Sequence, residues 1–523
     1  MADSGVSTPR RIVPLFIVHC HTGSVAEHDV AIIGAGVVGS FIARELSRYE
    51  LAVAVVEAGP DAASGASRAN SGVVHAGFFC LPGTLKAEAC TAGSRMYEGI
   101  CRDLGVPFHR CGKIVTAHSG AEVERLETLL ANGRASGISD LRMVDGDAVR
   151  AIEPNVGCHA ALVSPSSAIV SPYETTIAAA EDACVNGVRF LLNARVVSVR
   201  NGGSTEEPLH VISTADGREV RARSAVNAAG LSSARIAAMF GLGGFSVHPW
   251  RGEYLLMDRA VGGLINGMVY PLAPPGEPTL GVHLTPTVAG HILVGPSVEF
   301  LDAPTTATTA TRHAEMLASA RALLPGISAR HVIKAFAGLR AKLVPEGGTS
   351  TYGDVDFAVE ESPAGVVHLM GIESPGLTAA PALAQRAVGM VLAHLGGADR
   401  KDASMVLPYK WPYATPPADA GEDALRRRAD LAASEPDRGA VVCRCEHVTR
   451  ADVMAALDNP LGAKGLDSIK FRTRARMGRC QGGFCLPRIA DILVRERGVH
   501  PSEVALAGAG SEPFTGWLKE VSR

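Results

Sequence analysis

The sequence has no long apolar run, no marked excess of charge and no internal repeat. Its longest early apolar stretch, residues 12–18, contains Pro14 and is shorter than the roughly 18–20 residues of a membrane-spanning helix. Lysine and arginine number 50 against 53 acids, which gives a formal net charge of −3. Nothing in that balance indicates nucleic acid as a main partner. We therefore expect no transmembrane segment and no nucleic-acid binding.

The cysteine content is not that of a disulfide-rich secreted protein. The total of 11 is odd and no secretory signal is recognisable, which favours a reducing compartment. Residues 1–28 contain Arg10, Arg11 and several serines and threonines, so they are either a flexible extension or a mitochondrial targeting segment. We expect a cytoplasmic protein, free or peripheral to a membrane, with the mitochondrion as the alternative.

Residues 29–57 have the pattern of a βαβ unit. Short apolar strands are expected at 30–33 and 53–56, with a helix at 37–49 between them. The chain of 523 residues is long enough for several domains. This segment is the expected start of a dinucleotide-binding domain.

Three glycines and one acid occupy the informative positions of that unit. Gly34, Gly36 and Gly39 form G-x-G-x-x-G at the first strand-to-helix turn, and Glu57 ends the second strand. The glycines permit a tight turn, close approach of backbone to a pyrophosphate and close helix packing. Glu57 can accept hydrogen bonds from a ribose hydroxyl. The alternative is an ordinary glycine-rich turn.

Further along the chain, the pattern predicts a second domain and a linker. Residues 245–300 contain short β-like runs with prolines, which predict an antiparallel sheet facing the substrate. Residues 366–395 read as a strand, a glycine-rich turn and a helix whose N-terminus could face the cofactor. Residues 405–440 contain five prolines and mixed charges, and are predicted to be a partly ordered linker.

Four cysteines near the C-terminus form one constellation of C-x-C followed, after 34 residues, by C-x-x-x-x-C: Cys443, Cys445, Cys480 and Cys485. Four thiolates suit zinc or a [2Fe–2S] cluster, although C-x-C is less usual in structural zinc sites. Segment 443–497 has 11 Lys/Arg against 6 Asp/Glu, and this excess would offset an anionic cluster. Four unrelated thiols remain the alternative.

Five segments of residues 29–400 carry a resemblance to a known family: 67–77, 251–254, 281–287, 336–340 and 371–378. They resemble the FAD-dependent D-amino-acid-oxidase-like superfamily. Within it they look most like glycerol-3-phosphate dehydrogenases of the anaerobic large-subunit type and the related L-2-hydroxyglutarate dehydrogenases. The cysteine segments resemble the bacterioferritin-associated-ferredoxin-like [2Fe–2S] domain, but use C-x-x-x-x-C where the stand-alone ferredoxin has C-x-x-C.

The resemblance implies an α/β protein. A Rossmann-like FAD-binding domain is interleaved with an antiparallel-sheet substrate domain, and a small, mainly helical [2Fe–2S] domain follows. The expected segments are FAD-binding at about 29–90, 150–240 and 345–400, substrate-binding at about 91–149 and 241–344, [2Fe–2S]-binding at 441–500 and a tail at 501–523.

The resemblance also implies which residues bind FAD. They are Gly34, Gly36, Gly39 and Glu57 at the ADP half, and Ser67, Arg68, Gly230, Ser374, Gly376, Leu377 and Thr378 along the rest. The alternative is that the later turns only pack the sheet.

Oxidation of an alcohol needs a base for the hydroxyl proton, and His75 is the first candidate, with His283 second. Arg251 and Arg340 lie in segments expected to face the flavin, and an arginine fork suits phosphate and carboxylate equally. Lys342 would favour a dianionic phosphate. The alternative is that these cations only pair with acids.

The predicted reaction is oxidation of sn-glycerol 3-phosphate to dihydroxyacetone phosphate. Electrons would pass through the cluster to an external acceptor, either a quinone or a redox protein, soluble or membrane-associated. The alternatives are L-2-hydroxyglutarate or another 2-hydroxy acid as substrate, and a non-catalytic flavin and iron–sulfur redox module.

Overall fold

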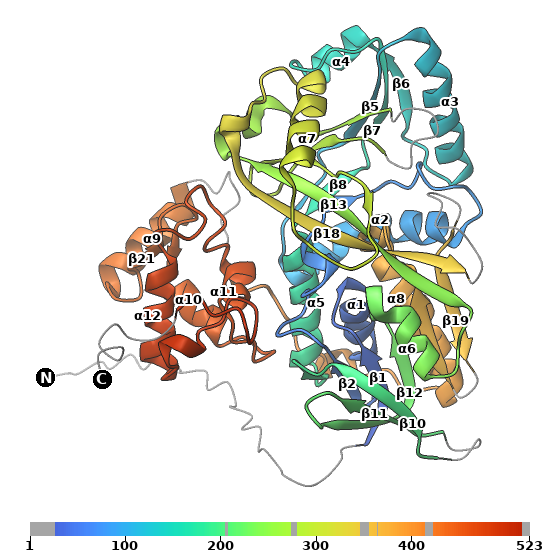
Figure 1. Ribbon diagram of the computed structural model, residues 1–523, viewed down its shortest axis with the longest axis vertical. Coiled ribbons are helices and arrows are strands. Elements are labelled where there is room, and N and C mark those ends of the chain that lie inside the picture. Colours follow the sequence, from blue (N-terminus) through green and yellow to red (C-terminus); the bar gives the residue numbers. More distant parts are fainter. Residues whose placement is uncertain are drawn as a thin grey trace, which may run out of the picture.

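The computed structural model describes residues 27–203, 208–272, 280–345, 355–362, 365–413 and 422–514. Figure 1 shows three parts: a sheet covered by helices, a second sheet above it, and a small helical module beside the first. Residues 1–26 of the expected N-terminal segment 1–28 and residues 515–523 of the expected tail 501–523 lie outside the described residues, so those predictions remain predictions.

The first sheet is the α/β core. Within the described residues its eight strands run in the order β10-β11-β12-β1-β2-β9, with β20 beside β12 and β19 beside β20. They are β1 (Glu27–Ile33), β2 (Val53–Val56), β9 (Arg189–Leu191), β10 (Val196–Asn201), β11 (His210–Thr214), β12 (Glu219–Asn227), β19 (Ala358–Ser362) and β20 (Val366–Met370). Strands β20, β12, β1, β2 and β9 are parallel, so their carboxyl ends share one edge.

Both faces of this sheet are buried, which explains why its strands are apolar throughout. Val30 and Ile32 of β1 belong to the core under the helices, whereas Ala31 and Ile33 belong to the core on the opposite face. The helices that pack with one another over the first face are α1 (Val37–Leu46), α2 (Leu85–Leu104), α5 (Pro172–Val185) and α8 (Gly376–Leu395). Helix α6 (Ser233–Met239) contributes Ile236 to the other face.

The second sheet is organised around two long strands, β13 (Phe245–Met257) and β18 (Val332–Pro345), paired antiparallel along most of their length. Its other strands are β5 (Lys113–Ala117), β6 (Arg142–Asp145), β7 (Ala160–Ser164), β14 (Met268–Pro271), β15 (His283–Pro286), β16 (Ile292–Gly295) and β17 (Glu299–Phe300). The sheet is antiparallel except where β5 pairs with β14. Helices α3 (Gly120–Ala135), α4 (Gly146–Ile152) and α7 (Ala310–Leu323) accompany it. A small third sheet joins β3 (Val73–Val74), β8 (Ala168–Val170) and β4 (Phe108–His109).

The expected domain boundaries differ from the structure in two places. Residues 91–104, expected in the substrate domain, belong to α2, which packs against α8 because Tyr97 and Leu104 are buried in the helix-side core of the first sheet. Strand β7, expected in the FAD-binding domain, lies between β5 and β6 in the second sheet.

The C-terminal module is small and mainly helical. It comprises β21 (Val441–Cys443), β22 (Val448–Thr449), α10 (Arg450–Leu457), α11 (Leu466–Thr473) and α12 (Leu486–Arg497), preceded by α9 (Glu422–Ser434). Thr449 and Asp452 form a capping box at the start of α10. Cys485 is the N-cap residue of α12.

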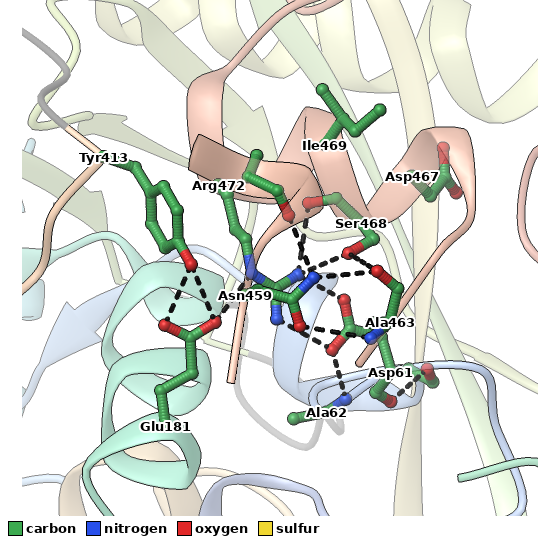
Figure 2. A network of polar contacts seen from close by, with 12 residues as sticks. Asp61, Ala62, Glu181, Tyr413, Asn459, Ala463, Asp467, Ser468, Ile469 and Arg472 are labelled. Carbon is green, nitrogen blue, oxygen red and sulfur yellow. Dashed lines mark hydrogen bonds and ion pairs between the residues drawn. The ribbon is translucent and has the colours of Figure 1, made fainter. Parts of the chain in front are cut away.

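One buried cation joins this module to the first sheet (Figure 2). The guanidinium of Arg472, on α11, is fully buried. It donates to Asp61 Oδ2 at 2.5 Å and to Glu181 Oε1 at 2.7 Å. Tyr409, in the segment between the two parts, donates to Glu181 Oε2 at 2.6 Å. The loop that contains Asp61, helix α5, the connecting segment that contains Tyr409 and the C-terminal module therefore meet at one ion-pair network.

We predict that Arg472→Met will destabilise the protein by roughly 3–5 kcal/mol, because it leaves Asp61 and Glu181 buried without a cation. Urea unfolding followed by circular dichroism measures this change. The control is Arg497→Met, which removes an exposed ion pair with Asp458 on the same module and is expected to cost less than about 1 kcal/mol. Equal effects of the two substitutions would refute the special role of Arg472.

Candidate active site and iron–sulfur site

A cavity of about 370 Å³ opens at the carboxyl ends of the parallel strands. Its lining comes from the turns after β1, β2 and β12, from the N-terminus of α8 and from the long strands of the second sheet. Predicted cofactor residues on its wall are Gly34, Gly36, Glu57, Ser67, Gly230, Ser374, Gly376 and Leu377. An edge shared by parallel strands and helix N-termini is where α/β sheets bind dinucleotides.

The glycine turn after β1 leaves no room for side chains. Gly34 has φ +107°, and a Cβ there would lie 2.6 Å from the carbonyl oxygen of Ala228. Gly39 does not line the cavity; a Cβ at this position would lie 1.9 Å from the carbonyl oxygen of Gly34. Gly34 therefore allows the turn after β1 to approach the turn after β12, and Gly39 allows α1 to pack closely on β1.

Glu57 and Ser67 hold the backbone around this turn. The Glu57 carboxylate accepts hydrogen bonds from the N–H groups of Ala35 and Gly59, both at 2.6 Å. Burial raises the pKa of Glu57, and these two N–H groups oppose the rise. Ser67 Oγ accepts from the N–H of Val37, at the first residue of α1, at 2.8 Å. Each side chain also lines the cavity, where a ribose or phosphate oxygen would meet it.

Besides Gly39, two predicted cofactor residues, Thr378 and Arg68, lie outside this cavity. The hydroxyl of Thr378 is buried, donates to Val73 O at 3.2 Å and accepts from the N–H of His75 at 3.0 Å. It therefore positions the His75 backbone instead of lining the cofactor cavity. Arg68 extends toward the C-terminal module, where it lies 3.7 Å from Asp467 and over the ring of Phe471.

His75 lines the cavity and is paired with a lysine that sequence reasoning did not select. Nζ of Lys113, at the start of β5, lies 3.3 Å from His75 Nδ1. Burial lowers the pKa of His75 well below its usual range, and Lys113 and His283 lower it further. Burial lowers the pKa of Lys113 to about 7. In the sequence, the only signal for Lys113 is that a single lysine begins an apolar strand.

His283 lines the same cavity and is fixed by its neighbours. Its ring stacks on Tyr270 with centroids 3.8 Å apart. Its Nδ1 lies 3.2 Å from the carbonyl oxygen of Gly281; because that oxygen can only accept, Nδ1 carries the proton. Among the described residues, the buried Nε2 has no hydrogen-bond partner. Burial, followed by Lys113, lowers the pKa of His283 to about 3.

The three predicted substrate cations differ in their surroundings. Arg340 lines the cavity, and its buried Nη1 has no hydrogen-bond partner among the described residues. Arg251 lies outside the cavity, with Nη2 2.5 Å from Glu299. Lys342 also lies outside it, 3.0 Å from Glu373. The structure therefore brings Arg340 alone of the three into the cavity, and the others pair with acids of the fold.

Two further arginines on the cavity wall, Arg195 and Arg235, were not selected from the sequence. Each comes from a segment without a recognisable motif, so no local signal distinguished it from a surface cation.

The four predicted cluster cysteines come together in the C-terminal module as two thiol pairs. Cys445 Sγ lies 3.6 Å from Cys480 Sγ, and a hydrogen bond from Cys485 lowers the pKa of Cys443 to about 6. Backbone N–H groups, including that of Arg476, also favour the Cys443 thiolate. In the described part of the chain no three His, Cys, Asp or Glu side chains surround a single metal position. Two pairs of thiols suit a two-iron cluster ligated by four cysteines.

Comparison with known proteins identifies the family. The family model described as FAD dependent oxidoreductase matches residues 29–390, which is more than half of the chain. The chain belongs to this family. A second family model, the BFD-like [2Fe–2S] binding domain, matches residues 441–495 of this FAD-dependent oxidoreductase.

Its relatives include two groups of dehydrogenases. A glycerol 3-phosphate dehydrogenase of Caloramator mitchellensis is 35% identical over 497 residues, covering 94% of this chain and 99% of that protein. An L-2-hydroxyglutarate dehydrogenase of Escherichia coli K12 is 34% identical over 273 residues, 52% of this chain and 64% of that protein. Among solved structures, the dithionite-reduced L-α-glycerophosphate oxidase from Mycoplasma pneumoniae with FAD bound has a TM-score of 0.67 and 26% identity, covering 74% of this chain and 100% of that one.

The family and the cavity together define the cofactors. The oxidoreductase uses FAD and a [2Fe–2S] cluster. The cavity at the glycine turn is the candidate site for FAD, and the four cysteines are the candidate ligands of the cluster. Among the described residues, no helix is long and apolar enough to cross a membrane.

We predict that Gly39→Ala will prevent FAD retention, because the new methyl group would collide with the Gly34 carbonyl oxygen and push α1 away from β1. The visible flavin absorbance of the purified protein measures this. The control is Gly65→Ala: Gly65 lines the same cavity, but a Cβ there meets nothing within 4 Å. Normal flavin content in the Gly39 variant would contradict the role of the turn.

Proposed function

We propose that this oxidoreductase converts sn-glycerol 3-phosphate to dihydroxyacetone phosphate and passes the electrons through the [2Fe–2S] cluster to a quinone or redox protein. The observation that carries the proposal is Nη1 of Arg340, which has no hydrogen-bond partner in the described part of the chain and lies in the cavity that also contains His75 and His283. A cation would hold the anionic group of the substrate while a histidine receives the hydroxyl proton. Bound FAD supplies the oxidant, accepting the hydride from the alcohol carbon.

The choice of phosphate over carboxylate rests on the relatives, since an arginine fork binds both. The Caloramator mitchellensis protein, named a glycerol 3-phosphate dehydrogenase, is similar over 94% of this chain. A match of this extent includes residues before and after the predicted linker, residues 405–440. L-2-hydroxyglutarate or another 2-hydroxy acid is the second candidate, supported by the hydroxyglutarate dehydrogenases that match about half of the chain.

The proton path follows from the pair formed by His75 and Lys113. When Lys113 is neutral it accepts a hydrogen bond from Nδ1–H of His75, which leaves His75 Nε2 free to take the hydroxyl proton. The Nδ1 proton then moves to Lys113, whose pKa of about 7 makes it a suitable final acceptor near neutral pH. When Lys113 is protonated it donates to Nδ1 instead, and His75 Nε2 carries the proton.

The substrate is tested by mixing the oxidised enzyme anaerobically with glycerol 3-phosphate or L-2-hydroxyglutarate and following flavin absorbance. We expect glycerol 3-phosphate to bleach the flavin. Bleaching by the hydroxy acid alone would reassign the substrate. Bleaching by neither would favour the remaining alternative, a non-catalytic redox module.

We predict that Arg340→Ala will weaken binding of the reacting substrate by roughly 2 kcal/mol or more, because the buried anion loses its charged donor. The apparent dissociation constant for flavin reduction measures the loss. Arg312→Ala, which removes an exposed pair with Glu315, is the control. An unchanged constant in the Arg340 variant would remove this residue from the site.

We predict that the rate of flavin reduction will rise with pH through about 7, as Lys113 loses its proton, and that Lys113→Met will lack this step. His75→Asn should retain FAD but slow reduction by orders of magnitude. Stopped-flow measurement across the pH range tests both. Near-normal reduction by His75→Asn, with loss in His283→Asn, would assign the base to His283.

A further inference from the structure

A second cavity, of about 510 Å³, lies between the FAD-binding part and the C-terminal module. Strand β18 contributes Lys334 and Phe336 to its wall, and α11 contributes Lys470 and Phe471. Residues 65, 66, 69–71, 231, 338 and 339 line both this cavity and the FAD cavity. Arg340 belongs only to the first cavity, and the two lysines only to the second.

The second cavity carries an uncompensated positive charge. Lys334 and Lys470 lie close enough to each other to interact electrostatically, and among the described residues neither forms an ion pair with a carboxylate. The nearby Asp467 is already shared by Arg68, at 3.7 Å, and Arg476, at 3.2 Å. Burial and the neighbouring Lys334 lower the pKa of Lys470 to about 7. Two adjacent half-buried amines cost free energy unless an anion lies between them.

One further polar group and the apolar wall of the cavity indicate what the rest of the ligand is like. His291 is 3% exposed, and its Nε2 has no partner among the described residues. Its Nδ1 lies 2.8 Å from the carbonyl oxygen of Met257 and so carries the proton, which leaves Nε2 as an acceptor. The remaining wall is largely apolar and includes Phe336, Phe471, Leu256, Leu293 and Met477.

We propose that this cavity binds a small organic anion, a phosphate or carboxylate carried on an apolar or aromatic body. Lys334 and Lys470 hold the anionic group, His291 accepts a hydrogen bond from a hydroxyl or N–H of the ligand, and the two phenylalanines contact its body. Because Lys334 lies on β18 and Lys470 on α11, the ligand contacts both parts of the protein. Its binding therefore favours the docked position of the iron–sulfur module.

The test is calorimetric titration of the full-length enzyme loaded with FAD and cluster, using phenyl phosphate, benzoate and inorganic phosphate as probes. We expect phenyl phosphate or benzoate to bind with a stoichiometry of one and more tightly than inorganic phosphate; the stronger of the two identifies the anionic group. Failure of both to bind, or equal binding of inorganic phosphate, would overturn the proposal.

Variants separate this cavity from the active site. The double variant Lys334→Gln/Lys470→Gln should weaken probe binding by about tenfold or more, the effect of losing a charged donor. Arg340→Ala and the exposed control Lys464→Gln should leave it unchanged. Loss of binding in Arg340→Ala with none in the lysine variant would place the probe in the active site and refute the second cavity.

Thermal unfolding at low salt provides a second measurement that needs only single variants. Lys470→Met should leave the midpoint unchanged or raise it, because it relieves repulsion with Lys334. It should also abolish the rise that phenyl phosphate produces in the wild type. A lowered midpoint together with an intact response to phenyl phosphate would show that Lys470 has only a structural role.

Discussion

The position of the iron–sulfur module depends on the buried guanidinium of Arg472. A fully buried cation is tolerated only where carboxylates and other acceptors replace its hydration, and Asp61 and Glu181 do so from two separate segments of the FAD-binding part. The module supplies the cation and the first sheet supplies the acids, so neither part satisfies its charges alone. Arg259, which follows β13, adds a second link because it pairs with Glu446 of the module. Arg474 of the module pairs with the same carboxylate and also donates to the Tyr173 hydroxyl on α5.

The other determinant of the site is the shared carboxyl edge of the parallel strands. The turns after β1, β2 and β12 meet there because parallel strands all end on the same side, and the long strand β18 brings Arg340 to the same cavity. The site is therefore assembled from two sheets: one presents the cofactor edge, the other a cation and His283.

Features that are local in the sequence could be predicted well. The glycine turn, the second strand ending at Glu57 and the four cysteines are spacing patterns whose chemistry does not depend on distant residues. The capped helix after Thr449 is of the same kind. Features that depend on tertiary contacts could not be predicted. Arg251 and Lys342 pair with acids of the fold, and only the folded chain shows that Arg340 has no ion pair with an acid among the residues that the structure describes.

Lys113 is a candidate functional residue that the sequence did not indicate, because its contact with His75 depends on tertiary structure. It begins β5 of the second sheet, whereas His75 follows β3 of the small third sheet, so their contact depends on how the two sheets pack, which local patterns do not specify. Arg68 directly follows Ser67, which contacts the first residue of α1, but its side chain extends to the module, where it meets Asp467 and Phe471. The position of a residue in the sequence thus predicted where its backbone lies better than it predicted which way its side chain points.

The hydrogen bonds of Thr378 have a consequence for how such enzymes diversify. This hydroxyl connects the third residue of α8 to the backbone of His75, so the histidine and the helix at the cofactor edge form a single rigid assembly. Arg340 and His283 lie on separate strands of the second sheet. A lineage could therefore alter the strands that contact the substrate while inheriting the oxidising machinery intact. On the function proposed here, substitutions in this architecture can therefore change the substrate preference without changing the type of reaction.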